Sequence, residues 1–281
     1  MAYQLLIFVM NLNCTYINLD SAKERKKRFE KQIRHLPFTF NRDSAKTVDD
    51  VRKENLNGKL HDRGKAIFLS HLEAINNVKQ NKNSWICEDD SIISRSCYKN
   101  ISKLNNFSDW DIIFTDVCFG DPSQILNLFN LNRFLKKKSE TTILSLKNYF
   151  FSSLNSYIIN SKSKRKIIEM INSKMHKIDE NLDIIIARFI REGHIKGYCF
   201  MPFLTSVNDF ADKDGTHCSS IQYLLNMSRK LFFCENDLLK EDDFSQLDKY
   251  FPENDLDEQS KNMLNIQKAF LHPKLLSRLI K

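Results

Sequence analysis

Segments typical of β-strands alternate with segments typical of helices along most of this chain. The run "CTYINLD", 14–20, is rich in β-branched and aromatic residues, and the strong helix formers of "SAKERKKRFEKQIRHL", 21–36, follow it. Ser21 and Glu24 have capping-box spacing, so we expect a helix to begin there. This alternation favours an α/β fold with a mostly parallel central sheet covered by helices on both faces.

The amphipathic segment at 64–80 is expected to form a second helix. Its apolar residues should face inward and its charged residues should face water. The inward set is Ile67, Leu72, Ile75 and Val78, and the outward set is Lys65, Glu73 and Lys79. Before this helix, a short strand is expected at 38–40, and the polar segment up to Arg63 is expected to be a loop with room for one helical turn.

Later segments fit the same two patterns. Further strands are expected at 84–87, 111–117, 141–146, 156–160 and 195–204, and further helices at 161–171 and 178–193. Pro202 would interrupt the last strand or place it on a sheet edge, and Gly193 would end the last helix. In sheets of this kind, ligands bind at the carboxyl ends of the strands.

The composition is that of a folded protein and leaves several partners open. Of the 281 residues, 42% are hydrophobic and 28% are charged, which is a globular composition. The formal charge of +8 favours an anionic partner, whether nucleic acid, anionic lipid or a phosphorylated small molecule. No recognised nucleic-acid motif accompanies this charge and the basic residues are mixed with acids, so we expect no nucleic-acid partner.

The cysteines predict neither a zinc site nor disulfides. All seven lie outside Cys-x-x-Cys pairs, and several lie in apolar runs, as the reduced thiols of a cytosolic protein do. The apolar run at 5–10 is too short to span a bilayer and has no basic residue before it, so we expect a buried strand or an ordered extension. These features predict a cytoplasmic protein whose membrane contact, if it has one, is peripheral.

Three consecutive carboxylates, Glu88, Asp89 and Asp90, follow the strand expected at 84–87. Adjacent carboxylates raise one another's pKa unless a cation or hydrogen-bond donors compensate, so this cluster beside a buried strand is costly without a role. Glu88 and Asp90 have the spacing at which two oxygen ligands on an extended loop reach one hard divalent cation. The structural alternative is a solvated turn in which Asp89 or Asp90 caps a following helix.

Four segments resemble, in this order, family 25 of the glycosyltransferases, the lipooligosaccharide and collagen galactosyltransferase family. They are "YINLDSAKERKKRF" at 16–29, "FLSHLEAI" at 68–75, "WICEDDSII" at 85–93 and "DWDIIFTD" at 109–116. Weaker similarities follow in "SYIIN", in "IDENL", and in Pro202 with "SSI" at 219–221. The resemblance covers about residues 14 to 221, and the order and spacing of its segments make it more specific than any single motif.

The resemblance implies a GT-A type fold that binds a nucleotide sugar, usually UDP-galactose, together with Mn²⁺ or Mg²⁺. It also implies transfer of the sugar, with inversion, to a glycan or glycolipid acceptor such as lipooligosaccharide. Carried over by position, the implied nucleotide and donor contacts are Asn18, Asp20, Arg25, Ser70, His71 and Asp89, and the implied metal ligands are Glu88 and Asp90.

An inverting transfer needs a base for the acceptor hydroxyl and an electrophile for the departing diphosphate. Asp179, which matches a later acidic position of the family, is the expected base, and Asp116 and Asp183 are its rivals. Structural alternatives exist for each kind of residue. Asp179 suits a helix start by its charge, His71 suits a packed and hydrogen-bonded position, and Arg25 suits a solvated helix face.

Two departures from the family leave the donor and the acceptor open. The family usually has Gly where Ala66 stands, and a small residue, often Gly, where Asn155 and Ser156 stand. A metal-dependent phosphoryl-transfer or phosphodiester-hydrolysing enzyme would also use clustered carboxylates, although no phosphate loop accompanies them here. A basic nucleic-acid-binding protein is the third and least favoured alternative.

The pattern changes after about Ser228, where helical stretches combine with an acidic block and a basic, leucine-rich end. We therefore expect a catalytic domain at 1–228 and a helical C-terminal appendage at 229–281. The end at 274–281 and the lysines at 136–138 would suit peripheral contact with the anionic inner face of the cytoplasmic membrane. The leucines of that end would equally suit a terminal helix that packs on the core.

Overall fold

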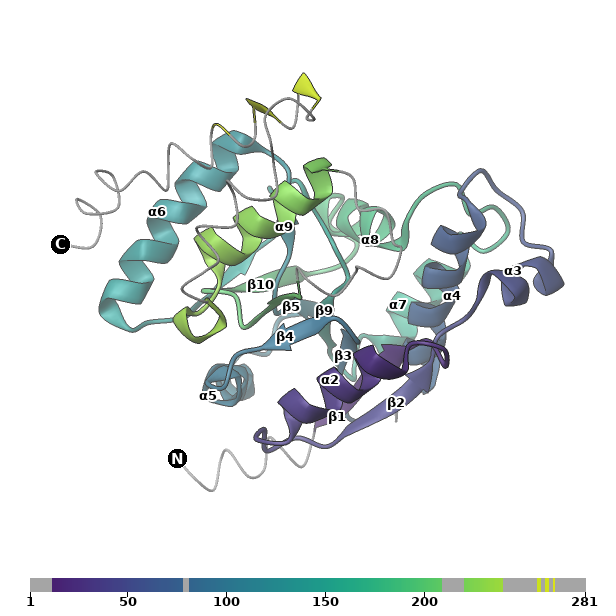
Figure 1. Ribbon diagram of the computed structural model, residues 1–281, viewed down its shortest axis with the longest axis horizontal. Coiled ribbons are helices and arrows are strands. Elements are labelled where there is room, and N and C mark those ends of the chain that lie inside the picture. The colour runs from purple at the N-terminus through teal and green to yellow at the C-terminus, as the bar shows by residue number, and fades with distance from the viewer. Residues whose placement is uncertain are drawn as a thin grey trace.

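The computed structural model describes residues 12–77, 81–208 and 220–239, together with 257, 258, 261, 262 and 265. Its centre is a seven-stranded sheet in the order β2-β1-β3-β9-β5-β10-β7 (Figure 1). These strands are β1 Leu12–Asn18, β2 Phe40–Ser44, β3 Asn83–Glu88, β5 Ile112–Phe114, β7 Thr142–Ser145, β9 Ser156–Ile159 and β10 Gly197–Met201. Strands β1, β2 and β3 are parallel, as are β5 and β10, while β9 and β7 run antiparallel to their neighbours. The expected α/β fold with a mostly parallel central sheet is confirmed.

Helices pack on both faces of this sheet. The α-helices are α2 Lys23–Ile33, α3 Val48–Glu54, α4 Asp62–Asn77, α5 Cys97–Ile101, α6 Pro122–Lys138, α7 Lys164–Asn172, α8 Leu182–Arg191 and α9 Ser220–Phe233, and two 3₁₀ helices are η1 Ser102–Asn106 and η2 Asn236–Leu238. Two small ladders join β4 Ser91–Ile93 to β11 Thr205–Val207 and β6 Cys118–Phe119 to β8 Phe151–Ser152. In Figure 1, α4 and α7 lie together at one end of the molecule, and α6 and α9 lie together at the other.

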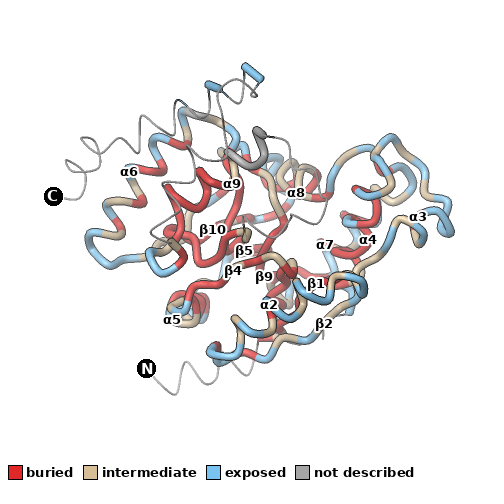
Figure 2. The backbone as a smooth tube through the Cα atoms, in the orientation of Figure 1, coloured by how far each residue is buried: buried red, intermediate tan, exposed pale blue. Residues whose placement is uncertain are grey.

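The side-chain alternation of the central strands builds a separate apolar core on each face of the sheet. In β3, Ile86 belongs to the core formed with α4, α6, α7, α8 and α9, whereas Trp85 and Cys87 belong to the core formed with α2 and α5. The neighbouring strand β9 divides in the same way, with Tyr157 in the first core and Ile158 in the second. Figure 2 shows the result, in which the sheet is buried and the outer turns of the helices are exposed.

Several local expectations need correction. The helix α2 has Ala22 as its N-cap without a side-chain capping bond, so the capping box expected from Ser21 and Glu24 does not form. The strand expected at 38–40 instead begins at Phe40 and runs to Ser44, and the loop expected before Arg63 contains the helix α3, which starts with a capping box of Thr47 and Asp50.

The outward and inward residues of α4 also differ from the expectation. Ile67 is 46% exposed, and it lines a cavity instead of packing in the core. Lys65 is buried, because its ammonium group reaches the carbonyl oxygen of Leu56 at 2.8 Å while its aliphatic stem is covered. Val78 and Lys79 lie outside the described residues.

Pro202 ends the strand β10 and does not place it on an edge of the sheet. Strand β10 stops at Met201, directly before the proline, and it lies inside the sheet between β5 and β7.

The helix α6 was not expected from the sequence.

The chain after Ser228 continues the core. Helix α9 crosses the expected division at residue 228, and Met227, Leu231, Phe232 and Phe233 are all buried in the larger core. The remainder of the tail is described only at 229–239 and at five later positions. The division into two domains therefore stays a prediction, as does the role of the run at 5–10, which lies outside the described residues.

Candidate active site

A cavity of about 720 Å³ opens at the carboxyl ends of β1 and β3. Its walls come from the turn between β1 and α2, from the start of α3, and from one side of α4, and the acidic triplet closes it at the end of β3. This is the place at which the parallel strands of an α/β sheet present their loops and helix starts. Of the residues expected at the site, those that line the cavity are Asn18, Arg25, Ser70, His71, Glu88, Asp89 and Asp90.

Asp89 connects the triplet to the first strand. Its Oδ2 accepts a hydrogen bond from Nδ2 of Asn18 at 2.6 Å and lies 3.2 Å from Nε of Arg25. Asn18 is held in turn by Nε of Arg42, which donates to its Oδ1 at 2.8 Å. Asp89 is buried, so these partners replace the water that its carboxylate loses. Asp89 therefore anchors the triplet to β1, and the helix cap considered for it does not form.

Glu88 is the outer end of a buried hydrogen-bonded chain. Its Oε1 lies 3.3 Å from Nε2 of His71, and Nδ1 of the same ring lies 2.9 Å from the hydroxyl oxygen of Tyr157. Burial opposes ionisation of Glu88, but the hydrogen bond from His71 and the charges of Arg25 and Arg229 outweigh it and lower the pKa of this carboxyl. Glu88 is thus a carboxylate at neutral pH, with 37% of its side chain exposed toward the cavity.

Asp90 has the opposite environment. Its Oδ1 is sealed from solvent and has no hydrogen-bond partner among the described residues. Burial, together with the charges of Glu88 and Asp89, raises the pKa of Asp90 to about 8. A buried carboxylate oxygen without a donor is costly, and a hard cation is the ligand that would satisfy it.

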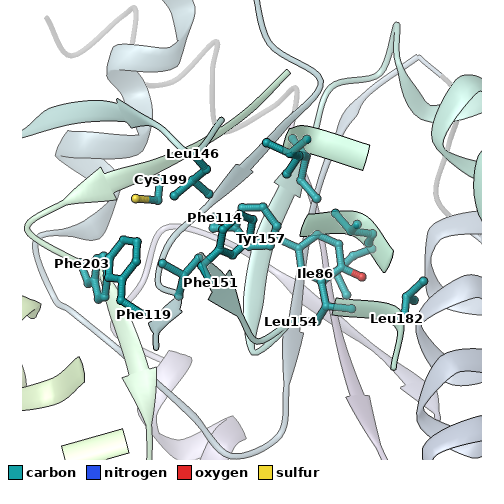
Figure 3. Packing of buried hydrophobic residues seen from close by; sticks show 14 of the residues in the cluster. Ile86, Phe114, Phe119, Leu146, Phe151, Leu154, Tyr157, Leu182, Cys199 and Phe203 are labelled. Atoms are coloured by element: carbon teal, nitrogen blue, oxygen red, sulfur yellow. The ribbon is translucent and has the colours of Figure 1, made fainter. Parts of the chain in front are cut away.

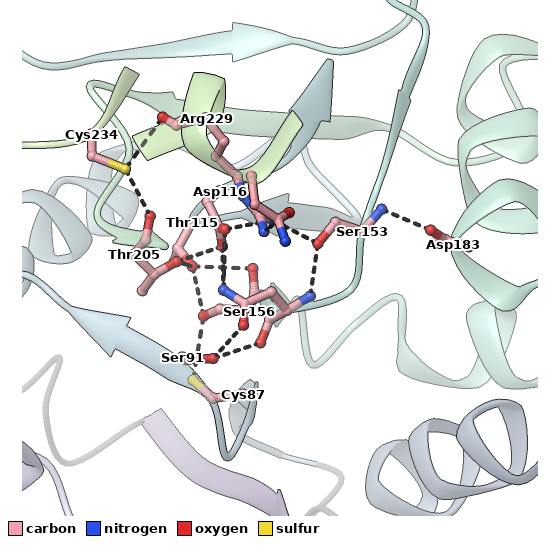
Figure 4. A network of polar contacts seen from close by, with 12 residues as sticks. Cys87, Ser91, Thr115, Asp116, Ser153, Ser156, Asp183, Thr205, Arg229 and Cys234 are labelled. Carbon is pink, nitrogen blue, oxygen red and sulfur yellow. Dashed lines mark hydrogen bonds and ion pairs between the residues drawn. The ribbon is translucent and has the colours of Figure 1, made fainter. Parts of the chain in front are cut away.

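A buried polar network adjoins the triplet and includes its flanking residues Cys87 and Ser91 (Figure 4). At its centre Asp116, 0% exposed, forms an ion pair at 3.0 Å with Arg229 of α9, 2% exposed. The amide of Asn155 donates to both carboxylate oxygens of Asp116 at 3.1 Å, and Thr205 donates to one of them at 2.6 Å. Sequence analysis did not identify Arg229, because nothing in the local pattern of α9 distinguishes a buried arginine from an exposed one.

Asn155 joins this network to the triplet. Its backbone carbonyl accepts hydrogen bonds from the backbone N–H of Glu88 at 2.8 Å and from the hydroxyl of Ser91 at 3.0 Å. Its side-chain oxygen accepts a further bond from Ser91 at 2.7 Å. A glycine at this position would lack all the side-chain bonds, so the departure from the family noted at Asn155 has a defined structural role.

Carboxyl groups outnumber guanidinium groups among the described residues around the triplet. Glu88, Asp89, Asp90 and Asp116 supply four carboxyl groups, and the guanidinium groups that act on them are those of Arg25 and Arg229. At neutral pH the raised pKa of Asp90 keeps a proton on its carboxyl group, which a bound cation would displace. With all four groups ionised, two negative charges would be in excess over these guanidinium groups. A single divalent cation between Glu88 and Asp90 would balance them, so the residues present fit such an ion. No group of three or more His, Cys, Asp or Glu side chains that could hold a metal by themselves occurs in the described part of the chain.

Two further expected residues, Ser70 and Asp20, have mainly structural partners. Ser70 donates its hydroxyl proton to the carbonyl oxygen of Ala66 at 2.7 Å and accepts from the backbone N–H of Lys46 at 2.8 Å, which fixes the loop before α3. Asp20 is 77% exposed, does not line the cavity, and pairs with Arg42.

Asp179, the expected base, also lies outside the set of cavity-lining residues. Its Oδ1 accepts the backbone N–H of Lys59 at 2.8 Å, and this bond is the main reason that the pKa of Asp179 is lowered. Its role as base stays a prediction. Its rival Asp116 is sealed by Arg229, Asn155 and Thr205, so it has no access to an acceptor hydroxyl.

Comparisons with known proteins add little to this geometry. No family model matches the chain, and no curated protein matches it either. Among solved structures, the chain is similar to a protein from Bacillus anthracis described as a glucose-1-phosphate thymidylyltransferase, solved in complex with a sucrose. The two share 11% identity over 79% of this chain and 83% of that chain, with a TM-score of 0.36. A similarity this low carries no argument about function.

No helix in the described residues is long and apolar enough to cross a membrane.

Proposed function

We propose that this protein is a metal-dependent glycosyltransferase that uses a nucleotide-sugar donor. The observation that carries the proposal is the pair of carboxyl groups that line the cavity, Glu88 and Asp90, of which Asp90 has a sealed oxygen without a partner among the described residues and a pKa raised to about 8. The order of segments that resembles family 25 of the glycosyltransferases supports the same function. UDP-galactose is the first donor to test.

Several residues that line the cavity suit the diphosphate group of a nucleotide sugar. Arg25, Lys23, Lys46 and Arg63 place positive charge on the walls, and the amino end of α2 faces the same space. Glu88 and Asp90 would hold Mn²⁺ or Mg²⁺, which when bound supplies charge stabilisation for the departing diphosphate. The rigid anchoring of Asp89 by Asn18 and Arg25 would keep the two ligand carboxylates in place on either side of it.

The test is a screen of nucleotide sugars with Mn²⁺ or with chelator, in which release of nucleoside diphosphate is measured. Glu88→Gln and Asp90→Asn are expected to lose ~100-fold or more of the metal-dependent turnover. Asp20→Asn is the matched control, because this exposed carboxylate lies beside the same turn without lining the cavity. Parent-like turnover in both ligand variants would refute the metal site, and release of phosphate or pyrophosphate instead would favour the phosphoryl-transfer alternative.

We also propose, from the resemblance, that the acceptor is a bacterial surface glycan such as lipooligosaccharide, reached at the cytoplasmic face of the membrane. Helix α6 suits contact with an anionic surface, because Phe134 is 53% exposed and the ammonium group of Lys138 lies 4.4 Å from the centre of its ring. Parent protein should sediment with phosphatidylglycerol vesicles more than with phosphatidylcholine vesicles, and Phe134→Ala with Lys137→Gln and Lys138→Gln should remove the difference. Equal sedimentation of parent and variant would refute the contact.

A further inference from the structure

The imidazole of His71 lies between a buried hydroxyl and the rim of the cavity. His71, on α4, is 1% exposed, and its two ring nitrogens contact different partners. Nδ1 is 2.9 Å from the hydroxyl of Tyr157 on β9, and Nε2 is 3.3 Å from Oε1 of Glu88 at the end of β3. Three elements that are distant in sequence therefore meet at one ring.

The position of Tyr157 is fixed by the core. Its side chain is 0% exposed, and β9 is hydrogen-bonded to β3 on one side and to β5 on the other. Figure 3 shows its ring among Phe114, Ile86 and Leu154, and the centre of the Phe114 ring lies 6.2 Å away. The hydroxyl oxygen is the polar end of an otherwise apolar packing arrangement, so it has little freedom to find another partner.

Only one protonation pattern satisfies all three groups. Burial raises the pKa of Tyr157 well above its ordinary value, so its hydroxyl keeps its proton and needs an acceptor. Nδ1 of His71 is the acceptor found for it among the described residues. If Nδ1 carried a proton, the hydroxyl proton would be left without a partner. If Nε2 lacked a proton, its lone pair would face the Glu88 carboxylate, and two acceptors would meet without a donor.

We infer that Tyr157 and His71 form a buried relay that positions Glu88. The Tyr157 hydroxyl donates to Nδ1, and the neutral ring therefore carries its proton on Nε2 and donates it to the Glu88 carboxylate. We assign both as positioning residues that act through Glu88. The inference deepens the proposed function, on which it rests to the extent that Glu88 is a metal ligand.

The relay would give the Glu88 carboxylate, which is 37% exposed, a defined direction. Long acidic side chains on a rim sample several rotamers, and a metal then has to bear the cost of ordering them. A hydrogen bond from a ring that is itself packed and hydrogen-bonded removes this freedom before any ligand arrives. Outer-shell partners of this kind typically change metal affinity by ~10- to 100-fold.

The hydrogen-bond pattern is tested first without reference to activity. Protein labelled with ¹⁵N at its seven histidines is examined by long-range ¹H–¹⁵N correlation spectra at neutral pH, and His71 is assigned by its loss in His71→Gln. The expected pattern is a neutral ring protonated at Nε2, with the Nδ1 resonance shifted in Tyr157→Phe. Tyr16→Phe is the matched control, because Tyr16 is equally buried and its hydroxyl donates to Glu30 at 2.7 Å, on the other face of the sheet. A ring protonated at Nδ1, or an Nδ1 resonance that Tyr157→Phe does not move, would overturn the inference.

The consequence for Glu88 is tested by Mn²⁺ binding to the whole protein in the presence of UDP. His71→Met fills similar space without a donor and should weaken Mn²⁺ binding ~10-fold or more, whereas His71→Gln can still donate and should stay within ~3-fold of the parent. Tyr157→Phe should fall between them.

Parent-like binding in His71→Met, beside a clear loss in Glu88→Gln, would overturn the relay and leave the metal site standing. Parent-like binding in Glu88→Gln itself would instead refute the metal site, and the histidine spectra would still decide whether the hydrogen bonds exist as inferred. Thermal unfolding of each variant identifies any that fails to fold, and the parent spectrum needs no variant to test the position of the proton.

Discussion

Asp89 and Asp90 are neighbours in the chain and have opposite electrostatic surroundings. Asp89 is neutralised from β1 and α2 by Asn18 and Arg25, so it needs no further ligand. Asp90 keeps a sealed oxygen without a partner among the described residues, and its pKa rises to about 8. One carboxylate of the triplet therefore belongs to the framework, while its neighbours, Glu88 and Asp90, remain available for a cation.

The buried pair of Asp116 and Arg229 gives a prediction at the same scale. Arg229→Met would leave a fully buried carboxylate without its counter-charge, and we expect a loss of about 3–5 kcal/mol in the free energy of unfolding. Arg165→Met is the control, because it breaks an exposed pair with Glu169 and should leave the stability close to that of the parent. Urea unfolding measures both.

The loss in Arg229→Met should depend on pH in a defined direction. Burial raises the pKa of Asp116, and Arg229 opposes that rise. An acid with a raised pKa in the folded state binds more protons there than in the unfolded chain, so its contribution to stability falls as the pH rises. Without Arg229 the pKa rises further, and the deficit should be larger at about pH 8 than at about pH 5. A deficit independent of pH would contradict this account.

The sequence pointed to several residues that line the cavity but did not assign their roles. The triplet follows from the rule that strand ends carry ligands, whereas Asn18, Arg25 and His71 were expected from the resemblance. The partners that separate Asp89 from Asp90, and the pairing of Asp116 with Arg229, depend on contacts between distant segments. No local pattern encodes such contacts, and for that reason Tyr157, which looks like an ordinary core residue in its strand, was not recognised either.

At the scale of elements, the loop between α3 and α4 is held to the segment before α8. The backbone N–H of Leu60 donates to the carbonyl oxygen of Ile178, and that of Ile178 donates to Asn57. Asp179 adds its bond to Lys59. Because α3 and α4 form one wall of the cavity, this junction fixes the position of that wall relative to the central sheet.

Gly58 makes this junction possible, and replacing it tests its importance. Gly58 has φ of +115°, and a Cβ there would lie 2.2 Å from the carbonyl oxygen of Ile178. We expect Gly58→Ala to lower the free energy of unfolding by about 2 kcal/mol or more, because backbone strain and a backbone clash add. Gly193→Ala is the matched control. It has φ of +82° with nothing within 4 Å, so strain alone should cost about 1 kcal/mol. Equal losses in thermal or urea unfolding would contradict the clash.

Two elements with clear apolar periods were expected correctly, but the helix α6 was missed although its buried residues Ile125, Leu128 and Phe129 have helical spacing. The helix α4 and the strand β3 were predicted because periodicity reports burial directly. The antiparallel direction of β9 was not predictable, since a buried strand has the same apolar run in either direction. The two-residue strands β6 and β8 are too short to show any period.

The whole molecule combines a net charge of +8 with a cavity whose floor is negative. The positive surface favours approach of an anion, and the acidic floor then disfavours its last step unless a cation precedes or accompanies it. Stable binding of an anionic nucleotide in the cavity is therefore expected to need a cation as well.

This expectation is tested by thermal and urea unfolding with added ligands. Mn²⁺ and UDP together, at ~100 times the dissociation constant, should raise the free energy of unfolding by about 2.7 kcal/mol. UDP with chelator should give much less, and Glu88→Gln should lose the part that depends on metal. Equal stabilisation with metal and with chelator would contradict a role for the cation.

The carboxyl groups of Glu88 and Asp90 also link the binding of a cation to the binding of a nucleotide. Each ligand should raise the affinity of the other by the same factor, because the coupling between two equilibria is reciprocal. Titrations carried out in the two possible sequences should then close a thermodynamic cycle. On the proposed function, a cell that holds its free manganese low would thereby limit how much nucleotide sugar this protein binds, even where that sugar is abundant.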